Sequence, residues 1–271
     1  MSDISHIPPN RSKYSNNRRY RSIFISDVHL GFSGANAEYL LDFLHSVECD
    51  YLYLVGDIVD IWQLKKKPYW PQTHSDVIRT ILGKAKYGTK VIYVPGNHDQ
   101  LLRTYAEHTF GNISVVRQAF HTKADGQRLL VTHGDQFDAA VVSSRWLGML
   151  GSQAYVVLLR LNGLVNTYRK LTGRPYWSLA KYLKHKVKNA VQAISNFENA
   201  VVESARKHGV DGVVCGHIHR PEISKFADIT YCNCGDWVES CTALLENNDG
   251  TMQLIEWTEQ GSAAEVLSEA A

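Results

Sequence analysis

Residues 91–99 read VIYVPGNHD, an apolar run that ends in a cluster of metal-binding side chains. A short apolar run closed by Pro and Gly is typical of a buried strand that turns into a loop. The amide of Asn97, the imidazole of His98 and the carboxylate of Asp99 suit a hard divalent cation. The stretch therefore predicts a strand that carries part of a metal site at its carboxyl end.

Four other apolar runs end in the same kind of group. They are residues 22–26 before Asp27-Val28-His29, 51–55 before Gly56-Asp57, 128–132 before His133-Gly134-Asp135, and 212–215 before Gly216-His217-Ile218-His219. Each group alone is common, because such turns are frequent and a lone His is more often a core residue. Five groups in order, each at the end of an expected strand, predict one shared site at the edge of an α/β sheet.

The side chains in these groups offer carboxylate, amide and imidazole ligands, and no thiolate. This mixture disfavours a closed structural zinc site and favours two divalent ions, for which we expect Mn²⁺. Two ions about 3.5–4 Å apart lower the pKa of a bridging water and stabilise an in-line displacement at phosphorus. Asp57 is the expected bridge, because one carboxylate can reach two ions. The pattern predicts a dimetal hydrolase of phosphoester or pyrophosphate bonds.

The ordered groups resemble those of the calcineurin-like metallophosphoesterases, over about residues 22–256. The resemblance implies an α/β fold of four layers, in which helices flank a sandwich of two β-sheets. The metal ligands that it implies are Asp27, His29, Asp57 and His219 for one ion, and Asp57, Asn97, His133 and His217 for the other. It also implies that His98 approaches the phosphate and assists the leaving group, while Asp99 orients His98.

A closer resemblance is to the UDP-2,3-diacylglucosamine diphosphatases, which use Mn²⁺ to cleave a lipid-linked nucleotide into UMP and a lipid phosphate. It is carried by residues 26–30, 133–135, 216–221 and 235–237, and it implies a helical insertion that holds acyl chains. Those enzymes have Arg where this chain has His98. A phosphodiesterase or nuclease with another substrate, and a non-catalytic scaffold of the same fold, therefore remain alternative hypotheses. The scaffold is disfavoured, because no ligand position carries an inert residue.

The chain divides into an expected flexible basic arm, residues 1–21, and one domain, residues 22–271. A helical-hairpin insertion is expected at about residues 140–207. Its first helix would run from Trp146 to Val165, and its second would open at Ser178, a favourable N-cap, and stop before Gly209.

The insertion is strongly basic, with eleven Lys or Arg against two acids in residues 139–208. Lys181, Lys184 and Lys188 form a stripe at helical spacing. We expect these lysines, together with Asn97 and Arg220, to contact an anionic substrate, and an anionic membrane surface is a second expected partner. Nucleic acid is less favoured because apolar residues outnumber the candidate phosphate contacts. An ordinary surface hairpin is the alternative interpretation, and the oligomeric state is left open.

The odd count of five Cys and the lack of a recognisable secretory leader predict a reducing compartment. No run approaches 18 apolar residues, so no membrane span is expected. We therefore expect a cytoplasmic protein, with peripheral attachment to the inner face of the cell membrane as an option.

Overall fold

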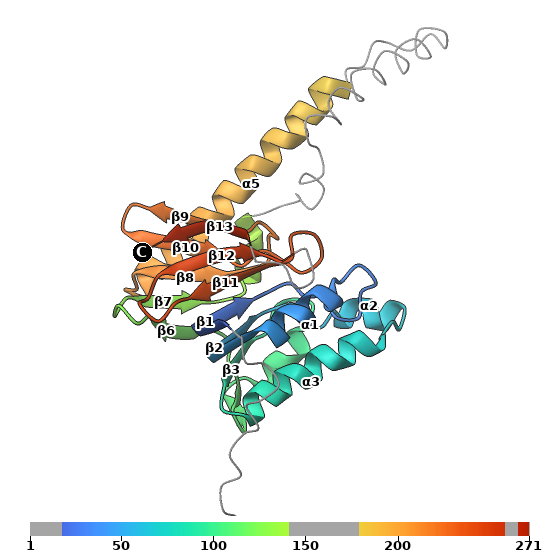
Figure 1. Cartoon of the computed structure of the whole chain (residues 1–271). Helices are drawn as coiled ribbons and strands as arrows, with labels where there is room; N and C mark the ends of the chain where they lie inside the picture. Colours follow the sequence, from blue (N-terminus) through green and yellow to red (C-terminus); the bar gives the residue numbers. More distant parts are fainter. Residues whose placement is uncertain (1–17, 141–178, 258–264, 271) are drawn as a thin grey trace, which may run out of the picture. The chain divides into compact units, whose positions relative to one another are not determined.

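This computed structural model describes residues 18–140, 179–257 and 265–270 (Figure 1). It divides into two compact units. The first unit comprises Met1–Asp135 and Val202–Ala271, and the second comprises Gln136–Val201. Among the residues described, no helix combines the length and the apolar content that crossing a membrane requires.

The first unit contains two β-sheets. In the described residues, the larger sheet has the order β13 (Glu265–Ala270), β12 (Met252–Glu256), β11 (Thr242–Glu246), β1 (Arg18–Ile25), β2 (Val47–Val55), β3 (Lys90–Val94), β5 (Ile113–Val115) and β4 (His108–Phe110). The smaller sheet has the order β6 (Ala119–Thr122), β7 (Arg128–Val131), β8 (Gly212–Cys215), β10 (Ile229–Asn233) and β9 (Glu222–Phe226). Strands β1, β2 and β3 are parallel neighbours, as are β7, β8 and β10. The expected α/β class with two sheets is confirmed.

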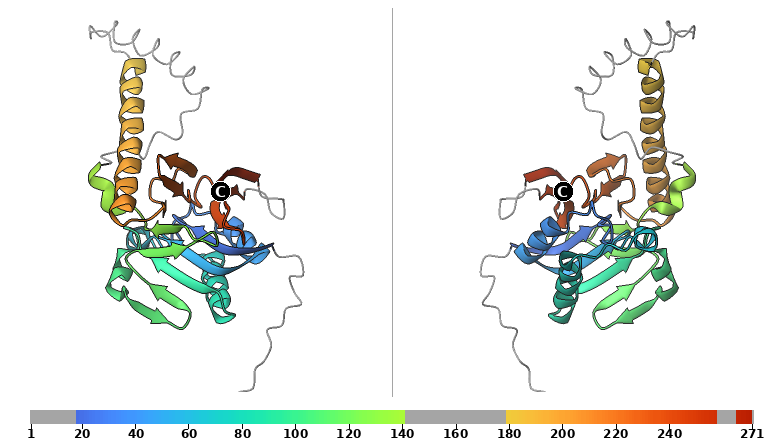
Figure 2. Two further views of the ribbon diagram at one scale, coloured as in Figure 1. Left: turned by 90° about the vertical axis from the view of Figure 1, so that its left-hand side faces the viewer. Right: turned by 90° about the vertical axis from the view of Figure 1, so that its right-hand side faces the viewer.

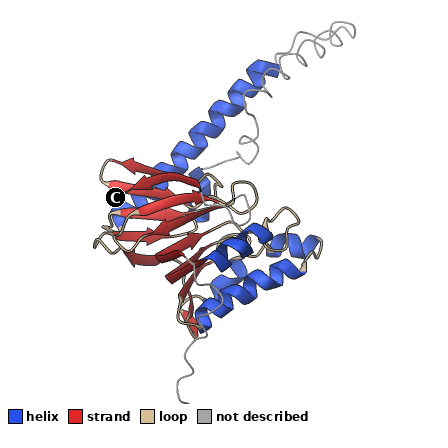
Figure 3. Ribbon diagram, in the orientation of Figure 1, coloured by secondary structure: helices blue, strands red, loops and turns tan. Residues whose placement is uncertain are grey.

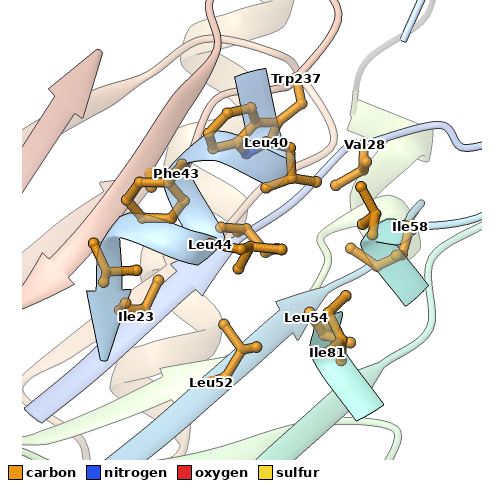
Figure 4. Close-up of a cluster of buried hydrophobic side chains, with 14 of the residues drawn as sticks. Ile23, Val28, Leu40, Phe43, Leu44, Leu52, Leu54, Ile58, Ile81 and Trp237 are labelled. Carbon is orange, nitrogen blue, oxygen red and sulfur yellow. The ribbon is translucent and has the colours of Figure 1, made fainter. Parts of the chain in front are cut away.

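Helices cover one face of the larger sheet, and side chains alternate between the two faces. Helices α1 (Ala37–Ser46) and α3 (Gln72–Lys86) lie together on that face (Figure 3). Ile23 and Leu52 point towards them and pack with Phe43 and Trp237 (Figure 4). Phe24, between Ile23 and Ile25, joins a second core cluster that includes strands of both sheets. Because the middle of this sheet is buried on both faces, the carboxyl-terminal halves of β1 and β2 are largely apolar rather than alternating.

The strands begin and end close to the positions that the apolar runs predict. The largest differences are at β1 and β2, which start at Arg18 and Val47, four residues before the predicted runs at 22 and 51. The polar beginning of β1 pairs with β2, with Arg18 opposite Val47, and Arg19 Nη2 donates to Asp50 Oδ1 at 2.6 Å. Residues 18–21 of the expected arm are therefore part of the sheet, because ladder bonds and an ion pair hold them. The rest of the arm lies outside the described residues.

The second unit is described for residues 136–140 and 179–201. Helix α5 (Leu179–Lys207) begins one residue after the predicted N-cap Ser178 and appears as one straight helix in both views of Figure 2. Its last turns belong to the first unit, and Gly209, with φ +61°, follows its end as predicted. The 3₁₀ helix η3 (Asp135–Ala140) ends where the first described range ends, at residue 140. The expected first helix of the hairpin, residues 146–165, lies outside the described residues.

A buried carboxylate links the two sheets. Glu246 of β11 accepts a hydrogen bond from Ser22 Oγ of β1 at 2.6 Å and contacts His121 Nε2 of β6 at 2.7 Å. Arg21 Nη1 lies 2.8 Å from its other oxygen. Burial alone would raise the pKa of Glu246, but His121, Ser22 and the backbone N–H of Ala124 lower it to about 2.

Acid should weaken the fold through this carboxylate. Since the pKa of Glu246 is 4.5 ordinarily and about 2 in the folded chain, the folded state binds fewer protons between these values. The stabilisation is present above about pH 4.5 and is lost as the pH falls towards 2. We expect Glu246→Gln to lower the free energy of unfolding at neutral pH by about 3 kcal/mol and to flatten its acid dependence, measured by urea unfolding. A variant with the wild-type acid slope would assign that slope to another group.

Candidate metal centre

The five predicted groups all lie at carboxyl ends of neighbouring parallel strands. Asp27 and His29 follow β1, Asp57 follows β2, and residues 97–99 follow β3. His133 follows β7, and residues 217–219 follow β8. Parallel strands place their carboxyl ends at one edge of a sheet, so two sheets with this arrangement bring five separate segments to one place.

The backbone of this place is unusual, since five of the predicted ligands have a positive φ. The values are 52° for Asp27, 53° for His29, 53° for Asp57, 71° for His217 and 53° for His219. A non-glycine residue in this region costs on the order of 1 kcal/mol or more and tends to occur at functional sites. Backbone hydrogen bonds impose it, since Asp27 N–H donates to Gly56 O at 3.0 Å and His29 N–H to Asp57 O at 2.9 Å.

Two glycines allow the carboxylates to lie close to the neighbouring loops. A Cβ on Gly96 would collide with Asp57 Oδ1 and would lie 2.7 Å from His133 Nε2. A Cβ on Gly216 would collide with Asp27 Oδ2. The glycine in each of these two groups is therefore required by close packing and not only by a turn.

Asp27, His29 and His219 form one group of potential ligands, with their ligand atoms within 4.8 Å of one another. His219 Nε2 lies 3.2 Å from Asp27 Oδ1 and 3.4 Å from His29 Nε2. Asp27 Oδ2 accepts the backbone N–H of His217 at 2.9 Å. Asp27 Oδ1 is buried and accepts no well-formed hydrogen bond from any residue that the structure describes. A buried oxygen facing two imidazole nitrogens in this way fits a divalent cation.

Asp57, His133 and His217 form a second group within the same 4.8 Å limit. His133 Nδ1 donates to Val55 O at 2.9 Å, so in the neutral imidazole Nε2 would present its lone pair to the group. That Nε2 lies 3.4 Å from Asp57 Oδ2 and 3.3 Å from Asn97 Oδ1. Six of the seven predicted ligands thus form these two groups, and the seventh, Asn97, contacts the second. These contacts place Asp57 in the second group, and its bridging of both groups stays a prediction.

Acids and histidines in these groups perturb one another's pKa strongly. Burial alone would raise the pKa of Asp27, yet His219, His133 and His29 hold it well below its ordinary value. Burial alone would lower the pKa of His133, yet Asp57, Asp27 and Asp135 raise it to about 10. His133 therefore carries a proton at neutral pH that offsets the negative charge of the carboxylates. A dimetal His/Asp site of this kind would exchange that proton for metal charge.

Metal binding should therefore release protons. His133 must be neutral to ligate, and its raised pKa means that it is protonated at pH 7 when no metal is bound. We expect at least about one proton released per ion bound near pH 7, and an affinity that rises with pH towards 10. Calorimetric titration with Mn²⁺ in buffers of different ionisation enthalpy measures this number directly. A binding enthalpy that is the same in every buffer would contradict it.

Asp60, which the sequence analysis missed, contacts two histidines of the site. Its Oδ2 lies 3.1 Å from His29 Nδ1 and its Oδ1 lies 3.0 Å from His98 Nδ1. It also accepts the N–H of Gln63 at 2.8 Å and so caps helix α2 (Ile61–Lys66). The sequence signal was an Asp three residues after Asp57 and directly before a short helix. Asp60 is therefore the acidic side chain placed beside Nδ1 of His98.

Asp99 does not have the role that the resemblance implied. Its Oδ1 accepts the N–H of Gly96 at 2.6 Å. Its Oδ2 accepts the N–H of Ile58 at 2.8 Å and the hydroxyl of Tyr93 at 2.5 Å. The expectation that Asp99 orients His98 is corrected, because its oxygens are engaged in joining the β2 and β3 loops.

Two further contacts were not predicted from the sequence. Arg103, on the 3₁₀ helix η2 (Gln100–Tyr105), donates from Nη2 to both oxygens of Asp135 at 2.8 Å and to Pro95 O at 3.0 Å. It thereby ties the β3 loop to the β7 loop. Trp62 of α2 covers the His98 ring, with centroids 4.3 Å apart and planes tilted by 34°. Both contacts join segments that are distant in the sequence.

Of the predicted substrate contacts besides Asn97, only Arg220 has a described side chain. Arg220 is exposed, and its Nη2 lies 3.1 Å from Glu222 Oε2, on the strand that follows. Lys181, Lys184 and Lys188 lie on α5, but their side chains are outside the described part of the chain. Their contact with substrate stays a prediction.

Comparison with known proteins adds an independent finding. The family model for calcineurin-like phosphoesterases matches residues 20–221. A UDP-2,3-diacylglucosamine hydrolase of Xanthomonas oryzae pv. oryzae is 27% identical over 244 residues, which cover 84% of this chain and 96% of that protein. The hydrolase of the same name in Shigella sonnei is 26% identical over 215 residues, covering 74% and 83%. The solved structure of Yfce, a phosphoesterase from E. coli, is 17% identical, has a TM-score of 0.47, and covers 92% of this chain and 98% of its own.

Proposed function

Because this chain belongs to the calcineurin-like phosphoesterase family, we propose that it hydrolyses the pyrophosphate bond of a lipid-linked nucleotide such as UDP-2,3-diacylglucosamine. The observation that supports hydrolase activity is the pair of His/Asp groups, Asp27-His29-His219 and Asp57-His133-His217, at the strand ends. The substrate class is supported by relatives that carry that name and match most of the chain. The insertion and its basic helix α5 supply the region expected to meet the lipid.

We assign the ligands as the two groups present them. Asp27, His29 and His219 would hold one ion, and Asn97, His133 and His217 the other. Asp57, which lies in the second group, is the proposed bridge to the first. A carboxylate, amide and imidazole set favours Mn²⁺. When bound, such a pair supplies an activated water and neutralises charge at phosphorus. Metal analysis of protein purified without chelators tests this, with Mn²⁺ expected at about two ions per chain.

His98 is the proposed acid for the leaving group. Asp60 Oδ1 lies 3.0 Å from Nδ1 of His98. The Nε2 atom of His98 lies 3.9 Å from Asp57 Oδ2 and so faces the ligand groups. In that position Nε2–H can be donated to the oxygen that leaves phosphorus. The Trp62 ring covers the imidazole and keeps water from one of its faces. Orientation by Asp60 and cover by Trp62 are what this chain itself contributes to the step.

The test is release of UMP from UDP-2,3-diacylglucosamine with Mn²⁺. We expect turnover at ordinary enzyme rates, about 1 per second or faster, and its loss in Asn97→Ala. Asn112→Ala is the matched control, because Asn112 lies in a turn and its side chain bonds only to Ala85 O, at 2.8 Å, in the described contacts. No release of UMP, with a generic aryl phosphodiester still cleaved, would reject the substrate and keep the dimetal hydrolase.

A second candidate is a phosphodiesterase with another substrate, and His98 favours it. The diphosphatases that this chain resembles have Arg at that position, and a His oriented by Asp60 can serve many leaving groups. Faster cleavage of single-stranded DNA or of a bis-aryl phosphodiester than of the lipid nucleotide would select this candidate. Failure to cleave any of these substrates in the Mn²⁺-loaded protein would favour a non-catalytic scaffold.

A further inference from the structure

A short segment beside the site exposes aromatic and basic side chains together. Its members are Trp62, Lys65, Lys66, Lys67, Tyr69 and Trp70, and we call them the 62–70 surface. The side chains of Trp62, Tyr69 and Trp70 are 39%, 40% and 42% exposed. The other two Trp that the structure describes, at positions 237 and 257, are buried. Among the described residues, the exposed tryptophans are thus confined to this segment, where three lysines follow one another.

The segment is held in place by packing behind it. Asp60 caps α2 by accepting the N–H of Gln63 at 2.8 Å. The buried imidazole of His74 accepts the N–H of Gly31 at 3.0 Å, and the Trp70 ring meets its edge with centroids 5.4 Å apart. Trp70 Nε1–H donates to Ser75 Oγ at 3.0 Å. The exposed aromatics are therefore presented by a fixed frame, which lowers the entropy cost of binding.

The charge of this surface is not neutralised by nearby acids. Lys65, Lys66 and Lys67 are exposed, and none forms an ion pair with an acidic side chain in the described part of the chain. Three uncompensated positive charges at consecutive positions create a local potential that attracts anions. Lys86 by contrast stacks on Tyr87, and Lys90 stacks on Tyr51.

The surface adjoins the metal centre. Trp62 contacts His98, with ring centroids 4.3 Å apart. Leu64, on the same helix, fills the space where a Cβ of Gly31 would lie, two residues after His29. Whatever binds the 62–70 surface is therefore next to the side of the site from which the leaving group departs.

We propose that the 62–70 surface docks on an anionic lipid surface. Trp and Tyr settle at the boundary between apolar chains and headgroups, and adjacent lysines gain from anionic lipid. A single-stranded nucleic acid would need cations spread along a groove beside stacking rings, whereas these three lie on one short run. This proposal deepens the proposed function. It rests on that function in one respect only, namely that a lipid-linked substrate would be bound at the membrane surface. Docking itself is independent of catalysis.

The test is partitioning of the full chain onto vesicles, without substrate. Vesicles of phosphatidylcholine alone are compared with vesicles that also contain phosphatidylglycerol, at low and high salt. We expect binding only to the anionic vesicles. Replacing Lys65, Lys66 and Lys67 together by Gln should weaken it about fivefold for each lysine, so roughly 100-fold in all.

The matched control replaces Lys86, Lys90 and Lys225 by Gln. These lysines are also exposed and lie elsewhere in the first unit, so the change in net charge is the same. We expect this triple variant to bind within about twofold of the wild type, since its lysines lie away from the docked surface. Equal loss in both triple variants would show attraction by total charge and would overturn the proposal. So would unchanged binding in the first triple variant, or absence of vesicle binding by the wild type.

Two measurements separate this proposal from its alternatives. Cleavage of a soluble aryl phosphodiester should be unchanged in the Lys65, Lys66, Lys67 variant, which shows that the chain is folded and the metal centre intact. A failure of the proposed function would appear as no release of UMP from UDP-2,3-diacylglucosamine by the wild type, and not in vesicle binding. If a single-stranded oligonucleotide binds more tightly than the vesicles, and the same variant loses that binding, the surface serves nucleic acid and the lipid assignment is wrong.

Discussion

Asp57→Asn should lower hydrolysis by about a thousandfold or more while the protein stays folded. The amide keeps an oxygen that can accept the N–H of His98, which Asp57 Oδ1 accepts at 2.7 Å. It loses the negative charge that faces His133, whose Nε2 lies 3.4 Å from Asp57 Oδ2. An amide cannot bridge two cations as a carboxylate can, so both proposed metal positions weaken together.

The measurement is kcat with Mn²⁺ in excess, together with bound metal and the thermal unfolding midpoint. Asp50→Asn is the matched control, because Asp50 is an exposed carboxylate on the same strand β2 and pairs only with Arg19 among the described contacts. We expect its kcat to be unchanged. Full activity of Asp57→Asn at saturating Mn²⁺ would remove Asp57 from the bridging position and would leave the two ligand groups unconnected.

Asp60→Asn should lower kcat by about 10- to 100-fold, the usual cost of losing a carboxylate that orients a ligand or an acid. Asp60 holds His29 and His98 through their Nδ1 atoms. Its anionic form is favoured, because these histidines keep its pKa well below the ordinary value despite burial. Asn preserves the cap of α2, since Asn is as good an N-cap as Asp. The loss should therefore appear in activity and in metal affinity rather than in folding.

Asp99→Asn should affect stability rather than activity, the opposite of Asp60→Asn. It therefore tests whether Asp60, and not Asp99, orients His98. Asp99 braces two loops through Gly96, Ile58 and Tyr93 and does not orient His98. Its replacement should lower the free energy of unfolding by about 1–3 kcal/mol, because one accepting oxygen becomes a donor that faces the N–H of Gly96 or Ile58. Activity per folded, metal-loaded molecule should stay within about threefold of the wild type. If Asp99→Asn loses activity without losing stability while Asp60→Asn keeps both, the role implied by the resemblance is restored.

The positions of the metal ligands could be predicted from the sequence because each depends on local information. An apolar run closed by Gly or Pro predicts a buried strand and its end, and β3 and β8 begin and end within one residue of the predicted runs. The ligands follow those ends directly. Parallel pairing then brings them together without any further requirement on side chains. The start of β1 was less predictable, because Arg18 and Arg19 are polar and enter the sheet through pairing with β2.

The sequence by itself thus determined the α/β class, the five strand ends, the acids and histidines that gather at those ends, and the family to which the chain belongs. Only the tertiary structure decided which carboxylate contacts which histidine or backbone N–H. Asp60 and Asp99 are both acids beside a ligand group, and their roles differ because Asp99 meets Ile58, 41 residues away, while Asp60 meets His98. The same holds for Arg103 and Asp135, which are 32 residues apart. The partner of a buried charge is set by which loops fold against each other, and spacing along one chain does not contain that information.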